Sequence, residues 1–229
     1  MLELRNRVRG VFIKLPSTEV IDMVAAAAYQ FAVVDLEHSQ LSEADARGLV
    51  RHGRAIDLPT LVRIPELDRG VVNRLLEAGA AGIQLSTVRS AAQVRLARAM
   101  TRYAPEGARS ISLAHPQAGY GAVSLADYLQ AQRAAAPLLV AQIETADTDD
   151  PLAEIMAAGP DVAFAGTTDL AVDMELDTER VRARVDEIAS AAAAVGIPFG
   201  AFALDDERVA YQLLASDLSL LRSALANAA

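Results

Sequence analysis

Cysteine and tryptophan are both absent from this chain of 229 residues, and lysine occurs only once, as Lys14. A protein without cysteine has no disulfide bond, no thiolate metal site and no cysteine nucleophile. Lys14 lies near the first predicted strand and has no cationic neighbour in the sequence that would activate it. Enzymes that depend on a disulfide or a reactive thiol are therefore excluded, and a lysine Schiff base is disfavoured.

Charge and hydropathy argue against two further classes of protein. Asp and Glu number 30 against 21 Lys and Arg, and no basic cluster could displace counterions from a nucleic acid. The longest apolar segments, 23–29 and 197–204, are far shorter than the ~18 residues of a membrane span. The first residues, MLELRNRVRG, also lack the apolar stretch of a signal peptide. We expect no nucleic-acid partner, no membrane and a cytoplasmic location.

Aromatic residues make up 4% of the chain and hydrophobic residues 52%, so the core must consist mainly of Ala, Leu and Val. These residues form short continuous runs without polar alternation, the pattern of strands buried on both faces of a parallel sheet. The predicted strands are residues 11–13, 31–35, 60–63, 82–85, 138–143, 162–165, 198–203 and 218–221.

Amphipathic segments lie between these runs, and four of them have recognisable starts. Ser, Thr, Asp and Asn at such positions accept hydrogen bonds from the first free N–H groups of a helix. The candidate capping residues are Ser42, Asp68, Ser90 and Asp205. Gly79 would end the second of these helices, and the last would run to Ala215.

Eight strands alternating with helices predict a (β/α)8 TIM barrel, which typically takes ~250 residues. No Pro-, Gly- or Ser-rich linker divides the chain, so residues 1–229 are interpreted as a single catalytic domain. An open doubly wound sheet is the alternative, although no G-x-G-x-x-G follows the first strand. Segment 104–136 is long enough to be a loop that covers the active site. The residues after 221 leave room only for an eighth helix that is truncated or missing.

Polar residues follow several predicted strands at their carboxyl ends, where barrel enzymes carry their active sites. They are Asp35, Glu37 and His38 after strand two, Arg63 at the end of strand three, Glu144 after strand five and Asp169 after strand six. Carboxylate oxygens and water suit Mg²⁺ or Mn²⁺, and a guanidinium matches the carboxylate of a 2-oxo acid. The pattern predicts a metal site with an anion-binding arginine beside it.

Each of these residues also has a purely structural interpretation. Glu144 could form a salt bridge at the rim, and Asp169 could cap the short helix that follows. Arg63 could be a surface residue, Asp35 and Glu37 could hold neighbouring loops by hydrogen bonds, and His38 could be a structural histidine. We favour a ligand role for Glu144 because a carboxylate after the apolar run LLVAQI is costly to bury unless it is paired or metal-bound. We favour the same role for Asp169 because it would be paired with Glu144.

The two remaining histidines are weaker candidates for the site. His52 lies in a predicted helix between Arg51 and Gly53, where a solvated position is expected. His115 belongs to the loop HPQAGYG, which could reach the mouth of the barrel.

Seven segments follow one another along the chain as VVDLEHS, LVRIPELD, LLEAGAAGIQL, RYAPEGARS, DYLQAQ, VAQIET and VAFAGTTDLAVDM. In this order and spacing they resemble the HpcH/HpaI aldolase family, the metal-dependent class II pyruvate aldolases. The resemblance covers nearly the whole chain, and it is more specific for the superfamily than for the reaction.

The resemblance implies a ligand set and a substrate site. Glu144 and Asp169 would bind the divalent metal, Mg²⁺ or Mn²⁺, with Co²⁺ as an alternative. Arg63 would contact the pyruvate oxygens and steady the enolate. The remaining substrate-binding groups would be Gln142, Gly166, Thr167 and Thr168.

The resemblance also implies the proton-transfer residues and the reaction. His38 of the D-x-E-H motif would take part in proton transfer, Asp35 would be a further catalytic residue, and Glu77 would orient the histidine. The reaction would cleave or form a carbon–carbon bond of a 4-hydroxy-2-oxo acid through a pyruvate-type enolate. The partners would be a small 2-oxo acid and an aldehyde, and we expect a homo-oligomer.

The chain departs from the family's usual pattern at several positions. It has GTTDLA in place of GPADLS, Ser86 in place of a proline and Ser110 in place of a glycine, and the last predicted strand lacks Gly-x-Asp. Two alternatives therefore stay open. One is a decarboxylase or CoA-ester lyase of the same superfamily, and the other is a non-catalytic binding member that has lost aldolase activity.

Overall fold

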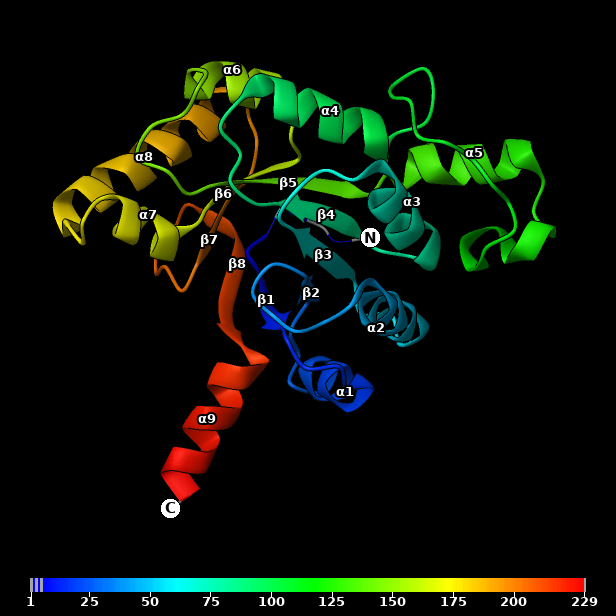
Figure 1. Cartoon of the computed structure of the whole chain (residues 1–229), viewed down its shortest axis with the longest axis horizontal. Coiled ribbons are helices and arrows are strands. Elements are labelled where there is room, and N and C mark those ends of the chain that lie inside the picture. Colours follow the sequence, from blue (N-terminus) through cyan, green and yellow to red (C-terminus); the bar gives the residue numbers. More distant parts are fainter. Residues whose placement is uncertain (1, 3, 5, 229) are drawn as a thin grey trace.

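A computed structural model describes residues 2, 4 and 6–228 of the chain. Its strands form one closed barrel in which each strand pairs in parallel with the next and β8 returns to β1 (Figure 1). The (β/α)8 barrel predicted from the sequence is thereby confirmed. The strands are β1 Val8–Ile13, β2 Phe31–Asp35, β3 Thr60–Ile64, β4 Gly82–Leu85, β5 Leu138–Ile143, β6 Val162–Ala165, β7 Phe199–Phe202 and β8 Val209–Ser216.

Helices surround the barrel and connect its strands (Figure 1). They are α1 Thr18–Ala26, α2 Glu43–Ala55, α3 Arg69–Ala78, α4 Ala91–Thr101, η1 Pro116–Gly121, α5 Leu125–Ala134, α6 Leu152–Ala157, α7 Thr167–Asp173, α8 Thr178–Ala194 and α9 Asp217–Ala228. Three of the four predicted caps, Ser42, Asp68 and Ser90, accept the expected backbone hydrogen bonds. Within the described part of the chain, no helix is both long and apolar enough to cross a membrane.

The continuous apolar runs are buried on both faces, as the sequence predicts. On β2, Phe31 and Val33 point into the barrel, whereas Ala32 and Val34 pack under the helices. Successive side chains of a strand alternate between the two faces, so the residue after Val34 points inward again. That residue is Asp35, and the same alternation turns the last polar residues of several strands toward the barrel axis.

The last strand and the last helix are not where the sequence analysis expected them. Residues 209–215, predicted as part of a helix capped by Asp205, lie in β8, and residues 218–221, predicted as a strand, lie in α9. The eighth helix is therefore neither missing nor short, because α9 has 12 residues. It contacts chiefly the ends of β1 and β8 and projects from the body of the molecule (Figure 1).

The long segment 104–136 also lies elsewhere than expected. It contains η1 and α5, but it follows a helix and precedes a strand, so it belongs to the amino-terminal end of the barrel. There it packs beside α3, and it does not cover the end that carries the predicted site. The expectation of an active-site cover is wrong, because only loops that follow strands reach the carboxyl ends.

Candidate active site

The carboxyl ends of the strands surround a cavity of about 240 Å³. Its lining residues come from seven different strands or the loops directly after them. They are Phe12, Lys14, His38, Arg63, Gln142, Phe164, Gly166, Thr167, Thr168, Asp169, Phe202 and Ser216. Seven of the predicted site residues thus line one cavity: His38, Arg63, Gln142, Gly166, Thr167, Thr168 and Asp169.

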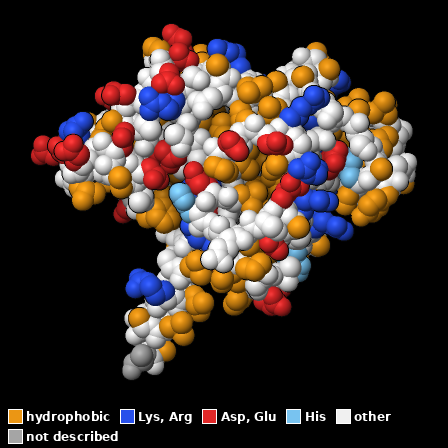
Figure 2. Space-filling model, in the orientation of Figure 1, with side chains coloured by type: hydrophobic (Ala, Val, Ile, Leu, Met, Phe, Trp, Pro, Cys, Tyr) orange, Lys and Arg blue, Asp and Glu red, His pale blue; other side chains and the backbone are white. Residues whose placement is uncertain are grey.

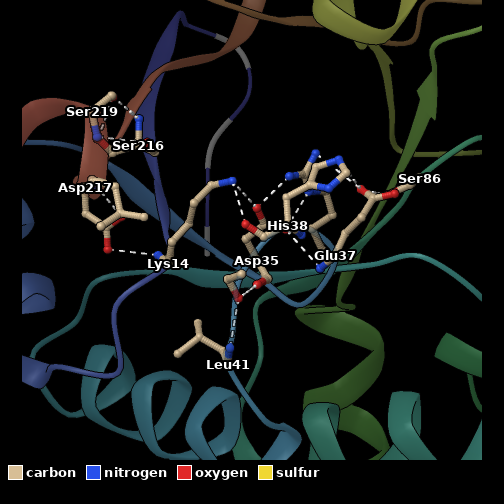
Figure 3. A network of polar contacts seen from close by, with 12 residues as sticks. Lys14, Asp35, Glu37, His38, Leu41, Ser86, Ser216, Asp217 and Ser219 are labelled. Carbon is tan, nitrogen blue, oxygen red and sulfur yellow. Dashed lines mark hydrogen bonds and ion pairs between the residues drawn. The ribbon is translucent and has the colours of Figure 1, made fainter.

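A buried ion pair joins β2 and β3 at this end of the barrel. Asp35 is paired in register with Arg63, whose Nε and Nη2 donate to the two carboxylate oxygens at 2.9 and 2.6 Å. The Nζ of Lys14 lies 3.0 Å from the second oxygen and also donates to the carbonyl of His38 (Figure 3). Asp35 is fully buried and Arg63 nearly so. One buried carboxylate therefore contacts two cations.

The charges around Asp35 hold it ionised. Burial by itself would raise the pKa of Asp35, but the hydrogen bonds and charge of Arg63, followed by Lys14, outweigh it and lower the pKa from 3.8 to about 2. Backbone N–H groups of Glu37 and His38 also donate to this carboxylate. The DLEH turn is thus folded around its own first residue.

Glu37 and His38 form the rim beside this pair. Glu37 accepts a hydrogen bond of 2.5 Å from the hydroxyl of Ser86, and Arg63 Nη1 lies 3.4 Å from the same oxygen (Figure 3). The imidazole of His38 lies 3.8 Å from that oxygen, and about half of its side chain is exposed. His38 is therefore placed where it can exchange a proton with a molecule in the cavity.

Glu144 directly follows β5 and is also buried, but only neutral groups bind it. Thr87 donates to Oε1 through its N–H and its hydroxyl at 2.7 and 2.8 Å, and the Gln142 amide donates to Oε2. Burial raises the pKa of Glu144, and the nearby charge of Asp169 raises it further. Thr87 adopts φ 48°, a left-handed conformation that is unusual for a residue branched at Cβ and that aims both donors at one oxygen.

Asp169 faces the same region from the first turn of α7. The structure gives its carboxylate no hydrogen bond and no ion pair with any described residue. Gly166 leaves space beside the Glu144 carboxylate. Any other residue at this position would fill that space, because its Cβ would lie 2.5 Å from Glu144 Oε2. Two neighbouring carboxylates without a cation between them fit a divalent metal ion.

The protein supplies few ligands for such an ion. Among the described residues, no three His, Cys, Asp or Glu side chains are grouped closely enough to hold a metal by themselves. Glu144 and Asp169 would therefore need water or substrate oxygens to complete the coordination. That requirement suits Mg²⁺ and Mn²⁺, which retain several such ligands, and it leaves positions open for a substrate.

The fold does not place Glu77 near His38 of the same chain. It lies in the last turn of α3, near the amino-terminal end of the barrel, and accepts a hydrogen bond from Asn73. It lines a separate cavity with His115, which is buried and bonded to the carbonyl of Ser112. Neither Glu77 nor His115 lies near His38, because the end of a helix in this fold is remote from the carboxyl end of the preceding strand.

A larger cavity, of about 470 Å³, lies between β4, β5 and α5 at the amino-terminal side. Its walls include Pro59, Leu76, Tyr128 and Pro137, and its charged members are only Arg54 and Asp57. It contains no pair of carboxylates and no histidine. A third cavity, of about 600 Å³ beside α8, is larger still, but its aspartates Asp186 and Asp206 are already paired with Arg208. The chemistry of the side chains selects the smaller cavity at the mouth.

Sequence reasoning missed several residues that shape the mouth. Lys14 stands at the carboxyl end of β1, so the strand-end rule applied to other strands would have found it. Asp217 was missed because β8 was misplaced; its carboxylate accepts hydrogen bonds from the N–H groups of Lys14 and Leu15 at 2.8 and 2.9 Å (Figure 3). No sequence signal marks Thr87, whose role depends on its backbone conformation.

Comparison with known proteins agrees with this geometry. A profile of the HpcH/HpaI aldolase/citrate lyase family matches residues 9–217. The chain belongs to the HpcH/HpaI aldolase/citrate lyase family. The resemblance seen in the sequence is thereby confirmed, and the protein is an enzyme of the carbon–carbon lyase type.

Individual relatives cover most of the chain. A hydroxypyruvate/pyruvate aldolase of Paraburkholderia phytofirmans is 32% identical over 86% of this chain and 78% of its own length. A 5-keto-4-deoxy-D-glucarate aldolase of Escherichia coli is 30% identical over 91% and 84%. The crystal structure of an HpcH/HpaI aldolase/citrate lyase family protein from Burkholderia cenocepacia matches with a TM-score of 0.89 and 26% identity, over 98% and 95% of the two chains.

The lowered pKa of Asp35 predicts a pH dependence of stability. Because the pKa is lower in the folded protein, the stabilisation of about 2 kcal/mol is complete above the unfolded value of 3.8 and is lost as pH falls toward about 2. Asp35→Asn should therefore be less stable than wild type near neutral pH, and the difference should shrink in acid. Urea unfolding followed by circular dichroism at a series of pH values measures it.

Asp206→Asn is the matched control for this experiment. Asp206 also pairs with an arginine, Arg208, and its pKa is also lowered to about 2, but it lies near the surface, where solvent screens the pair. Its pH-dependent loss should be clearly smaller. A constant difference between wild type and Asp35→Asn across the acid range would show that Asp35 does not stabilise the fold through its charge.

Proposed function

We propose that the chain, as one catalytic domain, is a divalent-metal-dependent aldolase that cleaves or forms a carbon–carbon bond of a 4-hydroxy-2-oxo acid. The observation that carries this proposal is the division of charge at the mouth. Arg63 and Lys14 surround Asp35, with Glu37 beside Arg63, whereas Glu144 and Asp169 form no ion pair with any described residue. An anionic 2-oxo acid and a cation would fit together between these two groups.

Glu144 and Asp169 would hold the metal, with Mg²⁺ or Mn²⁺ preferred and Co²⁺ as the alternative. When bound, such an ion acts as a Lewis acid that stabilises negative charge on a substrate oxygen. The two residues contribute differently. Glu144 is fixed by three hydrogen bonds, whereas Asp169 is exposed and has no such restraint in the described structure.

Arg63 and the backbone near Gly166 would bind the oxo acid. The Arg63 side chain packs over the ring of Phe12, 4.4 Å from its centre, and Asp35 fixes its orientation, so its position is set before substrate binds. Its positive charge would stabilise the negative charge that develops on the substrate as the C3–C4 bond breaks. The N–H groups of Thr167 and Thr168, in the first turn of α7, have no acceptor within the helix and are available to a carboxylate.

His38 would move the proton of the 4-hydroxyl group. Cleavage transfers the electrons of the C3–C4 bond to the enolate and leaves the aldehyde carbonyl, so the hydroxyl proton must pass to a base. His38 borders the cavity, and its Nε2 lies 3.8 Å from a carboxylate oxygen of Glu37. In the reverse direction the same imidazole would return the proton to the new hydroxyl group.

The names of the relatives support an oxo-acid substrate. They include hydroxypyruvate/pyruvate aldolase, 5-keto-4-deoxy-D-glucarate aldolase and 4-hydroxy-4-methyl-2-oxoglutarate aldolase. A CoA-ester lyase would need further cations for the phosphates of CoA. The lysine and arginine that line this cavity, Lys14 and Arg63, are both already paired with Asp35. The aldolase is therefore the better supported of the two functions.

The ligand assignment predicts the effect of two conservative substitutions. Glu144→Gln and Asp169→Asn should each lower metal-dependent turnover more than about 100-fold while the protein stays folded, because each removes a charged oxygen ligand. Pyruvate release from a panel of 4-hydroxy-2-oxo acids, with and without a chelator, measures the activity. Glu175→Gln, at an exposed position just after the same helix, is the matched control. Full activity in either ligand variant, or no effect of the chelator on wild type, would contradict the assignment.

The role of His38 predicts a different pattern. His38→Ala should lower kcat by roughly 10²–10⁴-fold, the usual contribution of a general acid or base, and should leave metal affinity unchanged. Turnover and Mn²⁺ affinity are measured on the same preparation. Loss of Mn²⁺ binding would instead make His38 a ligand, and unchanged turnover would remove it from the mechanism.

We also propose that the protein works as a homo-oligomer held by α9. This helix projects from the molecule and exposes an apolar surface of Leu218, Leu220, Leu221 and Leu225, visible as orange side chains along the projection in Figure 2. A helix of this length is only marginally stable in water without packing. If Glu77 orients His38 at all, a second copy must bring it there.

The oligomer proposal predicts the effect of charge on this surface. Leu221→Asp together with Leu225→Asp should reduce the molar mass in solution to that of a single chain, as measured by light scattering. Met23→Asp, on the exposed face of α1, is the control for an added charge at an exposed apolar position. A wild-type mass of about 24.2 kDa would show that the chain is a monomer and would refute the proposal.

A further inference from the structure

A row of buried polar side chains crosses the interior of the barrel and ends at Glu144. The hydroxyl of Tyr211 on β8 donates to Gln84 Oε1 at 3.2 Å, and Gln84 Nε2 on β4 donates to Gln142 Oε1 at 2.5 Å. The Gln142 amide then donates to Glu144 Oε2. All four side chains are at least 94% buried, and the surrounding interior is apolar.

The direction of these hydrogen bonds is determined at the Glu144 end. An ionised carboxylate can only accept, so Gln142 must present its N–H₂ to Glu144 and its oxygen to Gln84. Gln84 must then present its N–H₂ to Gln142 and its oxygen to Tyr211, and only a donor can satisfy that oxygen. Burial raises the pKa of Tyr211 well above its ordinary value, so its hydroxyl keeps the proton that it donates.

Tyr211 is held in place independently of its hydroxyl group. Its ring stacks on Phe31 at a centroid distance of 4.4 Å and meets the edge of Phe164 at 6.0 Å. Gly200 on β7 provides the space for it, since a Cβ there would lie 3.0 Å from the Tyr211 ring. Loss of the hydroxyl would therefore leave the ring packed and would leave Gln84 Oε1 buried without a donor.

We propose that Tyr211 and Gln84 are positioning residues that fix the amide of Gln142 and, through it, the orientation of Glu144 toward the metal. Neither residue touches the cavity at the mouth, so neither would bind substrate. Without this row, the Gln142 amide could turn its oxygen toward Glu144, and the carboxylate would lose its donor and rotate. The inference rests on the proposed function, because it takes Glu144 as a ligand.

Tyr211→Phe tests the inference with the loss of one oxygen atom. The affinity for Mn²⁺, measured from the electron paramagnetic resonance signal of the free ion, should fall roughly 10-fold, the lower end of the effect of residues that orient metal ligands. Gln84→Met, which removes both hydrogen bonds of the Gln84 amide, should lower the Mn²⁺ affinity further. The KM for the oxo acid at saturating Mn²⁺ should change less than the metal affinity.

Tyr128→Phe is the matched control. Tyr128 is also buried and also bonds through its hydroxyl, to Tyr103, but it lies in α5 at the other end of the barrel. It should lose a similar amount of stability in urea and keep the wild-type affinity for Mn²⁺. A general loosening of the fold would instead weaken Mn²⁺ binding in both tyrosine variants and would overturn the inference.

The outcomes separate this inference from the proposed function. Wild-type Mn²⁺ affinity in both Tyr211→Phe and Gln84→Met, with wild-type protein binding Mn²⁺ and active, would refute the positioning role alone. Absence of Mn²⁺ binding by the wild-type protein would refute the metal site itself, and the inference would fall with it.

Discussion

The bidentate pair of Asp35 and Arg63 organises the mouth of this barrel. The two residues are register partners on adjacent parallel strands, so the sheet itself places guanidinium and carboxylate side by side. Burial strengthens their attraction and makes each costly without the other. Lys14 also pairs with the Asp35 carboxylate, and the backbone N–H groups of Glu37 and His38 in the DLEH turn donate to it. A loop that would otherwise be free is therefore anchored, and with it His38.

The second buried carboxylate has the opposite electrostatic character. Glu144 is held by an amide, a hydroxyl and a backbone N–H group, which satisfy its oxygens but do not neutralise its charge. The pKa of Glu144 is raised and that of Asp35 is lowered, because only Asp35 is paired with cations. The fold thus keeps one carboxylate ionised as an internal counterion and leaves the other in need of a cation. The proposed metal site depends on that asymmetry more than on the number of acidic residues.

The strand-end rule made much of this predictable from sequence. Because every strand is parallel, Glu144 and Arg63 had to share one rim, although 81 positions separate their numbers. The rule failed where the strand itself was misread. The segment VAYQLLAS is apolar enough for a strand or a helix, and only pairing with β1 and β7 decides between them. Local sequence carries no information about that closure, so Asp217 was not recognised at the end of β8.

Other parts of the site depend on tertiary structure that cannot be predicted from a local sequence pattern. Glu77 precedes a strand, and the sequence does not reveal that this position lies at the opposite end of the barrel from His38 until the direction of α3 is considered. Thr87 has a left-handed backbone conformation, but the position is not a glycine or an asparagine, the residues that usually indicate this conformation in a sequence. Gln84 and Tyr211 are 127 positions apart and meet only across the interior, so an isolated glutamine in GIQL reads as a tolerated polar residue in a strand.

Asp217 connects the mouth to the projecting helix. Its carboxylate accepts hydrogen bonds from the N–H groups of Lys14 and Leu15, while its backbone begins α9. The position of Lys14, and through it one of the two cations on Asp35, is therefore tied to the direction in which α9 leaves the barrel. If α9 packs against a second copy of the chain, that contact restrains the same carboxylate that fixes the first βα loop. Assembly and charge balance at the mouth would then be linked through one buried aspartate, without any residue of α9 beyond Asp217 needing to touch the site.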